Sequence, residues 1–172
     1  MNEVIKNILT RRSIRKFSDK KIDRQDLEVL LKAACYAPSG MNRQTWQFTA
    51  VVDEGKIGQL ADAVAKALGK EGYDFYKPAA LIIPSNTRES RWGIDDNACA
   101  LQNIFLAAHS LGIGSVWINQ LRDCCDAPEV RAILTEMGIP ENHVIYGTAA
   151  LGYSALPEAG EVEKIGVVKI VE

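Results

Sequence analysis

The spacing of hydrophobic positions predicts helices and short buried strands that alternate along the chain. Apolar residues at helical spacing predict helices near residues 4–9, 23–37, 54–68, 95–111 and 127–137. Nearly continuous apolar runs, too short for helices, predict strands at residues 48–52, 79–84, 115–118 and 144–153. This interleaving favours a three-layer α/β or α+β sandwich with helices on both faces of one sheet.

Polar residues, glycine and proline predict where these elements begin and end. Asp23 is a suitable N-cap for the second helix, and Pro38 stops that helix. Gly69 caps the third helix, and Asp126 is expected to cap the last one. Pro84 is expected to mark the end of its strand. These signals leave polar loops between the elements.

Length and composition predict a single domain that covers residues 1–172. The chain has 47% hydrophobic and 24% charged residues, which is ordinary for a globular protein. A formal net charge of -2 gives no general attraction for nucleic acid. No stretch approaches the roughly 18 consecutive apolar residues of a membrane span, and the N-terminal residues lack a signal-peptide core. We therefore expect a cytoplasmic protein without a nucleic-acid or membrane partner.

The four cysteines predict neither a metal site nor a disulfide framework. Their spacing contains no C-x-x-C motif and no Cys/His cluster. Cys35 lies on the apolar face of a predicted helix and is expected to be a small core residue. The adjacent Cys124 and Cys125 are expected in a loop, with a structural or incidental role.

A stretch rich in aromatic residues, 72–78, fits neither helical nor strand periodicity. It holds Tyr73, Phe75 and Tyr76 between a glycine and a proline, so we expect a loop. Aromatic residues on such loops more often cover ordinary core. They are also candidates for the apolar walls of a ligand pocket.

The strongest candidate for chemistry is a basic run near the N-terminus. Four cations and one hydroxyl fall within residues 11–16. In an extended chain Arg11, Ser13 and Arg15 would point to one side, where arginine forks and a hydroxyl suit a phosphate. A solvated basic turn at the end of a helix is the alternative.

Two further polar segments are candidates for binding. Residues 38–46 form a polar loop before a strand, and Asn119 and Gln120 directly follow the predicted strand 115–118. In open α/β sheets, ligands commonly bind at this end of a strand. The only histidines, His109 and His143, form no convincing catalytic triad, and there is no G-x-S-x-G motif.

The chain resembles the nitroreductase family of FMN-dependent oxidoreductases. The resemblance rests on four segments in order: R-R-S-x-R-K-F at residues 11–17, the loop with Gln44 and Trp46 at 37–46, A-A-H-S-L-G-I-G-S-V-W-I at 107–118, and A-L-G-Y at 150–153. Together they extend over nearly the whole chain. The resemblance implies a nitroreductase-like sandwich around a central mixed sheet.

The family resemblance also implies a site for FMN. Arg11, Arg12 and Ser13 would hold the phosphate, and Arg15 would reach the N1/O2 edge of the ring, where a cation favours the reduced flavin. The backbone near Asn119 or Gln120 would face flavin N5. The other subunit of a homodimer would contribute the residues of the polar loop: Pro38, Ser39, Gly40, Asn42 and Gln44.

The function implied by the resemblance is hydride transfer from NAD(P)H to an oxidised acceptor such as a nitroaromatic, quinone or enone, by a ping-pong mechanism. Two alternatives remain open: a flavin-binding module for FMN storage, sensing or delivery without turnover, and a dedicated flavin-modifying or metabolite reductase. The tail 157–172 is expected to be a linker and a strand that reaches the partner subunit, because a lone strand must dock on a sheet edge.

Overall fold

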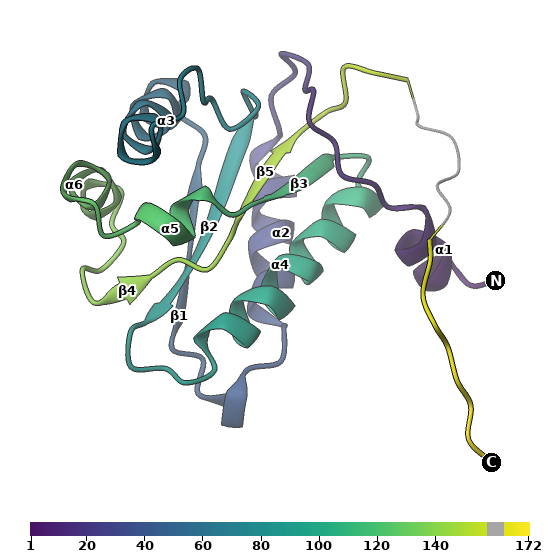
Figure 1. Cartoon of the computed structure of the whole chain (residues 1–172). Coiled ribbons are helices and arrows are strands. Elements are labelled where there is room, and N and C mark those ends of the chain that lie inside the picture. The colour runs from purple at the N-terminus through teal and green to yellow at the C-terminus, as the bar shows by residue number, and fades with distance from the viewer. Residues whose placement is uncertain (158–163) are drawn as a thin grey trace.

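The computed structural model describes residues 1–157 and 164–172 and shows a sheet with helices on both faces (Figure 1). The helices are α1 (Glu3–Thr10), α2 (Arg24–Cys35), α3 (Glu54–Leu68), α4 (Gly93–Ser110), α5 (Gln120–Cys124) and α6 (Pro128–Glu136), with a 3₁₀ turn η1 (Gly40–Asn42). The strands are β1 (Trp46–Val51), β2 (Ala80–Thr87), β3 (Gly114–Ile118), β4 (His143–Val144) and β5 (Thr148–Gly152). The predicted three-layer sandwich is confirmed.

The strands pair antiparallel in the order β1-β2-β5-β3, and β4 pairs with the far end of β2. One parallel bridge joins Ser13 to Ser115 of β3, and the Ile14 N–H donates to the Ser115 carbonyl at 3.0 Å. β5 is buried throughout, and β2 is buried except at its last residue, because helices cover both faces. The basic N-terminal segment is thereby fixed along the β3 edge of the sheet.

A hydrophobic core lies on each face of the sheet. α3, α5 and α6 cover one face, whose fully buried side chains include Leu60, Leu121 and Leu134. α2 and α4 cover the other face, whose fully buried side chains include Leu30, Leu101 and Ile104. Burying each such side chain contributes about 1.5–3 kcal/mol. The helical periodicity predicted the buried faces of α2, α3, α4 and α6. It did not predict α5, and Cys35, expected in the core, is exposed at the end of α2.

β2 runs through Pro84 to Thr87, so the expectation that Pro84 ends this strand is wrong. The Thr87 N–H donates towards β1, to the Thr45 carbonyl at 3.3 Å. Because N–H groups alternate between the sides of a strand, position 84 faces the opposite side. There β2 pairs with β5 only at residues 80–82 and with β4 only at 86–87. Proline therefore occupies a gap where no strand needs its missing N–H.

Three other boundaries also differ from expectation. Cys124 ends the short helix α5 and Cys125 caps it, where a loop was predicted. The N-cap of α6 is Ala127, and Asp126 instead binds two arginine side chains at 2.8–3.1 Å. The predicted strand 144–153 is divided into β4 and β5. Gly147 lies between them, where a Cβ would come within 2.6 Å of the Trp117 ring.

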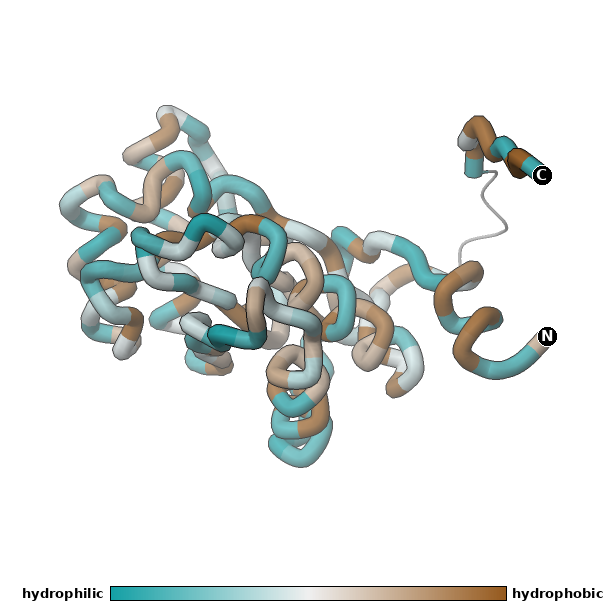
Figure 2. Tube along the Cα trace, turned by 90° about the horizontal axis from the view of Figure 1, so that it is seen from below, coloured by the Kyte–Doolittle hydropathy of each residue, from teal (hydrophilic) through white to brown (hydrophobic). Residues whose placement is uncertain are grey.

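α1 and the C-terminal tail stand apart from the sandwich (Figures 1 and 2). α1 buries none of its residues and leaves its apolar side chains exposed: Val4, Ile5, Ile8 and Leu9. Residues 164–172 are exposed and form no strand within the single chain. Most of the predicted linker, 158–163, lies outside the described residues. Whether the tail pairs with a partner's sheet remains a prediction.

Candidate functional site

The basic segment leaves α1 with two half-buried arginines, Arg11 and Arg12, followed by the exposed Ser13 and Arg15. Arg12 folds back, so that its Nη1 donates to three carbonyl oxygens at the end of α1 at 3.0–3.1 Å. These carbonyls would otherwise be unpaired at a helix C-terminus. The Arg12 Nε is buried and has no partner among the described residues. The segment thus keeps a donor that a bound anion or a second chain could satisfy.

Arg11 lies against an aromatic pair on α4 and β3. Its guanidinium carbon is 5.8 Å from the centre of the Phe105 ring, which lies 6.0 Å from the Trp117 ring. The Trp117 Nε1 donates to Asn119 Oδ1 at 2.7 Å. Burial and the neighbouring charge of Arg12 lower the pKa of Arg11. A negative ligand would offset both effects, and the half-exposed ring of Trp117 offers a planar surface beside it.

The polar loop 38–44 is anchored by a chain of buried hydrogen bonds. The Gly40 N–H donates to Asp96 Oδ1 of α4 at 2.8 Å, and the other Asp96 oxygen lies 3.5 Å from the Asn86 amide nitrogen. Asn86 Oδ1 accepts from the Thr45 hydroxyl at 2.7 Å. Asp96 and Asn86 are only 3% and 1% exposed. A buried carboxylate requires hydrogen-bond partners. This series of hydrogen bonds therefore fixes the start of the loop.

The loop itself has an unusual backbone. Met41, Asn42 and Gln44 have φ of 52°, 54° and 50°, a region in which side chains other than glycine are strained. The Gln44 side chain donates to Asn42 Oδ1 at 2.8 Å, and the Gln44 N–H donates to the Ser39 hydroxyl at 3.3 Å. Pro38, Asn42 and Gln44 remain exposed. These internal bonds hold the loop in a defined shape with its polar groups outward.

Trp92 at the start of α4 packs directly on this loop. A Cβ placed on Gly40 would lie 2.3 Å from Trp92 Cγ, so only glycine fits there. The guanidinium carbons of Arg43 and Arg91 lie 5.3 Å and 5.1 Å from the centre of the Trp92 ring. An aromatic ring from the start of α4, with two cations beside it, therefore lies against the loop.

Asn119 and Gln120 follow β3, as predicted, and Gln120 contacts the loop 72–78. The Tyr73 hydroxyl donates to Gln120 Oε1 at 3.4 Å, and burial raises the pKa of Tyr73. Phe75 is fully buried, with its ring 4.9 Å from that of Tyr73. Phe75 is therefore a residue of the hydrophobic core, whereas Tyr73 links this loop to Gln120, directly after β3.

Within one chain, the predicted site residues lie in two separate places. α1 attaches near the C-terminal end of α4, where Asn7 donates to the Leu106 carbonyl at 2.9 Å. The loop 38–44 attaches at the other end, through Asp96 and Trp92 (Figure 1). α4 has 18 residues, which span about 27 Å. One chain thus keeps Arg11 far from the polar loop.

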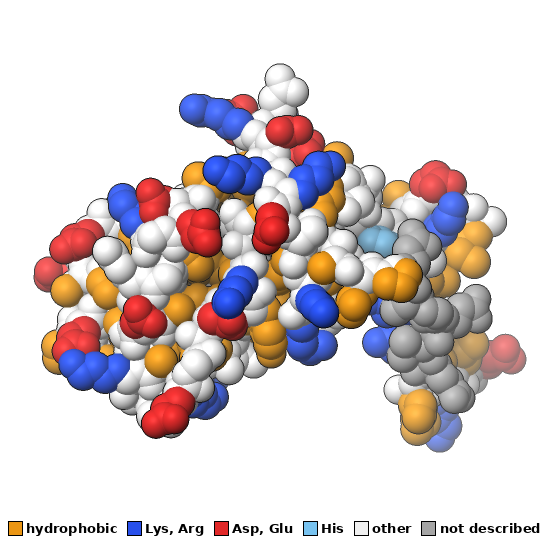
Figure 3. Space-filling view, turned by 90° about the horizontal axis from the view of Figure 1, so that it is seen from above, with side chains coloured by type: hydrophobic (Ala, Val, Ile, Leu, Met, Phe, Trp, Pro, Cys, Tyr) orange, Lys and Arg blue, Asp and Glu red, His pale blue; other side chains and the backbone are white. Residues whose placement is uncertain are grey.

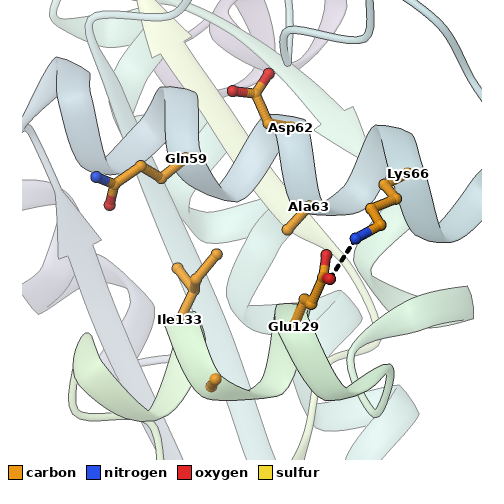
Figure 4. Close-up of a pocket in the computed structure, with 7 residues that line it drawn as sticks. Gln59, Asp62, Ala63, Lys66, Glu129 and Ile133 are labelled. Carbon is orange, nitrogen blue, oxygen red and sulfur yellow. Dashed lines mark hydrogen bonds and ion pairs between the residues drawn. The ribbon is translucent and has the colours of Figure 1, made fainter.

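A hollow of about 500 Å³ lies between α3 and α6, and none of the predicted site residues lines it. Ala63 and Ile133 form its apolar wall, and an ion pair between Lys66 and Glu129 lies at one end (Figure 4). The hollow is on the face of the sheet opposite α4. It is therefore unconnected with the two groups of polar residues described above.

Charges of both signs are mixed on the face seen from above, where Lys and Arg side chains are interspersed with Asp and Glu (Figure 3). Among residues 1–157 and 164–172, no three His, Cys, Asp or Glu side chains are grouped to hold a metal ion. In the same ranges, no helix has the length and apolar character needed to cross a membrane.

Comparison with known proteins identifies the family. The sequence profile of the Nitroreductase family matches residues 8–81 and 73–153. The chain belongs to the nitroreductase family. A nitroreductase of Bacteroides fragilis, solved with bound FMN, is 44% identical, with a TM-score of 0.95 and complete coverage of both chains.

Two relatives are similar in sequence to this nitroreductase-family chain. A protein of Archaeoglobus fulgidus, whose name is NADH dehydrogenase/NAD(P)H nitroreductase, is 36% identical over 157 residues, 89% of this chain and 86% of that protein. The NADPH-flavin oxidoreductase of Vibrio harveyi is 32% identical over 164 residues, 89% of this chain and 66% of that protein. The predicted family and fold are therefore confirmed.

Several residues around the site were not predicted from the sequence. Phe105 lies beside Arg11, and Trp117 lies beside Phe105. Trp92 and Asp96 hold the polar loop. Trp92 lies in a basic and aromatic stretch, residues 85–92, whose sequence has the character of a surface connection and does not indicate this contact. Asp96 was expected only near the start of a helix, and its bond to Gly40 spans 56 positions.

Proposed function

We propose that this nitroreductase-family protein is an FMN-dependent oxidoreductase that transfers hydride from NAD(P)H to a nitroaromatic, quinone or enone acceptor by a ping-pong mechanism. The observation that carries the proposal is the half-buried pair Arg11 and Arg12. Arg11 lies over the Phe105 ring, and the Arg12 Nε has no partner among the described residues. The relative solved with FMN, which matches the whole chain, supports this choice of cofactor.

The residues present fit such a cofactor. FMN, when bound, supplies hydride transfer at its N5. Arg11, Arg12 and Ser13 would hold its phosphate, because two guanidinium groups and a hydroxyl provide charge-assisted donors for a dianion. Arg15 would stabilise negative charge at the N1/O2 edge of the ring. The backbone at Asn119 or Gln120, placed by β3 and α5, would face N5.

We further propose a homodimer in which the loop 38–44 completes the site of the partner. The loop residues that would contribute to the partner's FMN site are Pro38, Ser39, Gly40, Asn42 and Gln44. The argument is geometric, because the loop and Arg11 lie at opposite ends of α4. The exposed apolar side chains of α1 and of the tail also need a surface to cover them. We place the dimer in the cytoplasm, a reducing compartment that suits four free cysteines.

The test is spectroscopic and kinetic. The protein reconstituted with FMN should be yellow, and NADPH or NADH should bleach the flavin band under anaerobic conditions. A nitroaromatic, quinone or enone should then restore the band, and initial rates with both substrates varied should give the parallel lines of a ping-pong mechanism. Bound FMN that neither nucleotide bleaches would favour a storage or delivery module. A protein that cannot be loaded with FMN would overturn the proposal.

A further inference from the structure

Two exposed arginines, Arg43 and Arg91, form a cationic pair on Trp92. Their guanidinium carbons lie 5.3 Å and 5.1 Å from the centre of its ring. Neither arginine forms an ion pair with a carboxylate of the described residues, in contrast to the pairs formed elsewhere by Arg24, Arg88 and Arg131. Two like charges are thus held near one ring without a negative partner.

The surroundings keep this pair in place. Trp92 is packed against Gly40, where not even a Cβ would fit, so the ring has little room to move towards the loop. The guanidinium groups rest beside a ring that attracts cations. Their planar forks of donors suit a phosphate more than a neutral group. Both side chains therefore offer charge-assisted donors to an anion beside the Trp92 ring.

The position of the pair restricts which anion it meets. Arg43 belongs to the loop 38–44, and Trp92 packs on the same loop. The FMN phosphate is already assigned to Arg11, Arg12 and Ser13 at the other end of α4. In the proposed reaction, the remaining phosphate monoester is the 2′-phosphate of NADPH, a group that NADH lacks.

We propose that Arg43 and Arg91 bind the 2′-phosphate of NADPH and give the protein a preference for NADPH over NADH. This inference rests on the proposed function, because it requires the loop to border a flavin site of the dimer. The loss of one charge-assisted hydrogen bond corresponds to a weakening of about 10-fold or more. The loss should affect only the nucleotide that carries the 2′-phosphate.

The experiment measures binding of NADP⁺ and NAD⁺ to the oxidised, FMN-loaded protein by calorimetry. Arg43→Gln and Arg91→Gln remove one charge each, and the double variant removes both. Arg24→Gln is the matched control, because Arg24 is an exposed arginine at the far end of α2. We expect each single variant to bind NADP⁺ about 10-fold more weakly, with NAD⁺ affinity and the flavin spectrum unchanged. The control should match the wild type.

Other results would overturn the inference in distinguishable ways. Equal affinity of the wild type for NADP⁺ and NAD⁺, or unchanged NADP⁺ affinity in the double variant, would remove the assignment while leaving the oxidoreductase intact. Loss of FMN from the variants would assign the arginines to the flavin instead. Weaker inhibition by 4-nitrobenzoate than in the wild type, with NADP⁺ binding unchanged, would assign them to an anionic acceptor. Failure of the proposed function itself would appear in the wild type, as FMN that neither nucleotide bleaches.

Discussion

Replacing Gly40 by alanine tests how the polar loop is held. The added methyl group would lie 2.3–2.7 Å from three Trp92 atoms, and the farthest of these, at 2.7 Å, is the Trp92 Cβ. Rotation of the ring cannot move the Trp92 Cβ, so the backbone of the loop or of α4 must shift. Gly40 has no positive φ, and the effect would therefore come from this contact alone.

The size of the effect follows from the geometry. The 2.7 Å contact is about 0.7 Å short of the 3.4 Å at which ordinary contact begins. A shift of that size would stretch the 2.8 Å hydrogen bond from the Gly40 N–H to Asp96 towards the limit of a hydrogen bond. Overpacking costs about 1–3 kcal/mol, and weakening a charged hydrogen bond adds to it. We expect the free energy of unfolding to fall by about 2–4 kcal/mol.

Urea unfolding of the FMN-free protein, followed by tryptophan fluorescence, measures this change. Gly58→Ala is the control, because no atom lies within 4 Å of a Cβ there and alanine favours the helix α3 by about 0.5–1 kcal/mol. In a Trp92→Gly background, which removes the Cβ as well as the ring, the cost of Gly40→Ala should largely disappear. Wild-type stability of Gly40→Ala, or an undiminished cost without the Trp92 side chain, would refute the reasoning.

Three further predictions concern strain, a buried thiol and the tail. Lys77 has φ of 48°, so Lys77→Gly should raise the free energy of unfolding by about 0.5–1 kcal/mol in urea titrations, whereas Lys70→Gly should lower it. Burial raises the pKa of Cys124 to about 11, so at pH 8 iodoacetamide should modify it about 100-fold more slowly than an unperturbed thiol. Since the unfolded thiol loses its proton first, this contribution to stability should be full below pH 9 and decline towards pH 11. Equal labelling of folded and urea-unfolded Cys124 would contradict this. Truncation after Leu156 should weaken the proposed dimer in analytical ultracentrifugation, and an equally stable, FMN-loaded dimer would show that the tail does not hold the subunits together.

The sequence predicted elements whose signals are local. The apolar face and the glycine cap of α3 predicted that helix correctly, and the continuous apolar run predicted β2. It could not predict that β2 continues past Pro84, because this depends on where β5 ends and β4 begins on the neighbouring side. The short helix α5 was missed for a related reason: five residues carry too little periodicity to be recognised.

The residue types of the candidate site are visible in the sequence, but their arrangement is not. The basic run and the polar loop contain chemistry that is visible in the sequence. The contacts of Gly40 with Trp92 and Asp96 join residues more than fifty positions apart, and no local pattern encodes them. The same holds for Arg11 and the Phe105 ring. Such contacts arise only when α4 is packed against the sheet between the two segments.

The position of α4 leads to a decisive test of the composite site. If two chains pair about a two-fold axis across α4, the Arg11 end of one helix meets the polar-loop end of the other, which creates two equivalent sites. Consider a heterodimer that carries Arg11→Ala in one chain and Gly40→Ala in the other. With composite sites, one site receives both substitutions and the other receives neither.

This heterodimer, assembled with two affinity tags, should therefore bind one FMN with wild-type affinity, as measured by quenching of flavin fluorescence. Each homodimeric variant should bind FMN about 10-fold or more weakly at both of its sites, because a charge-assisted donor or the loop geometry is lost. If each site instead belonged to one chain, both sites of the heterodimer would carry one substitution. No wild-type-affinity site would then remain, and the geometric argument from the two ends of α4 would fail.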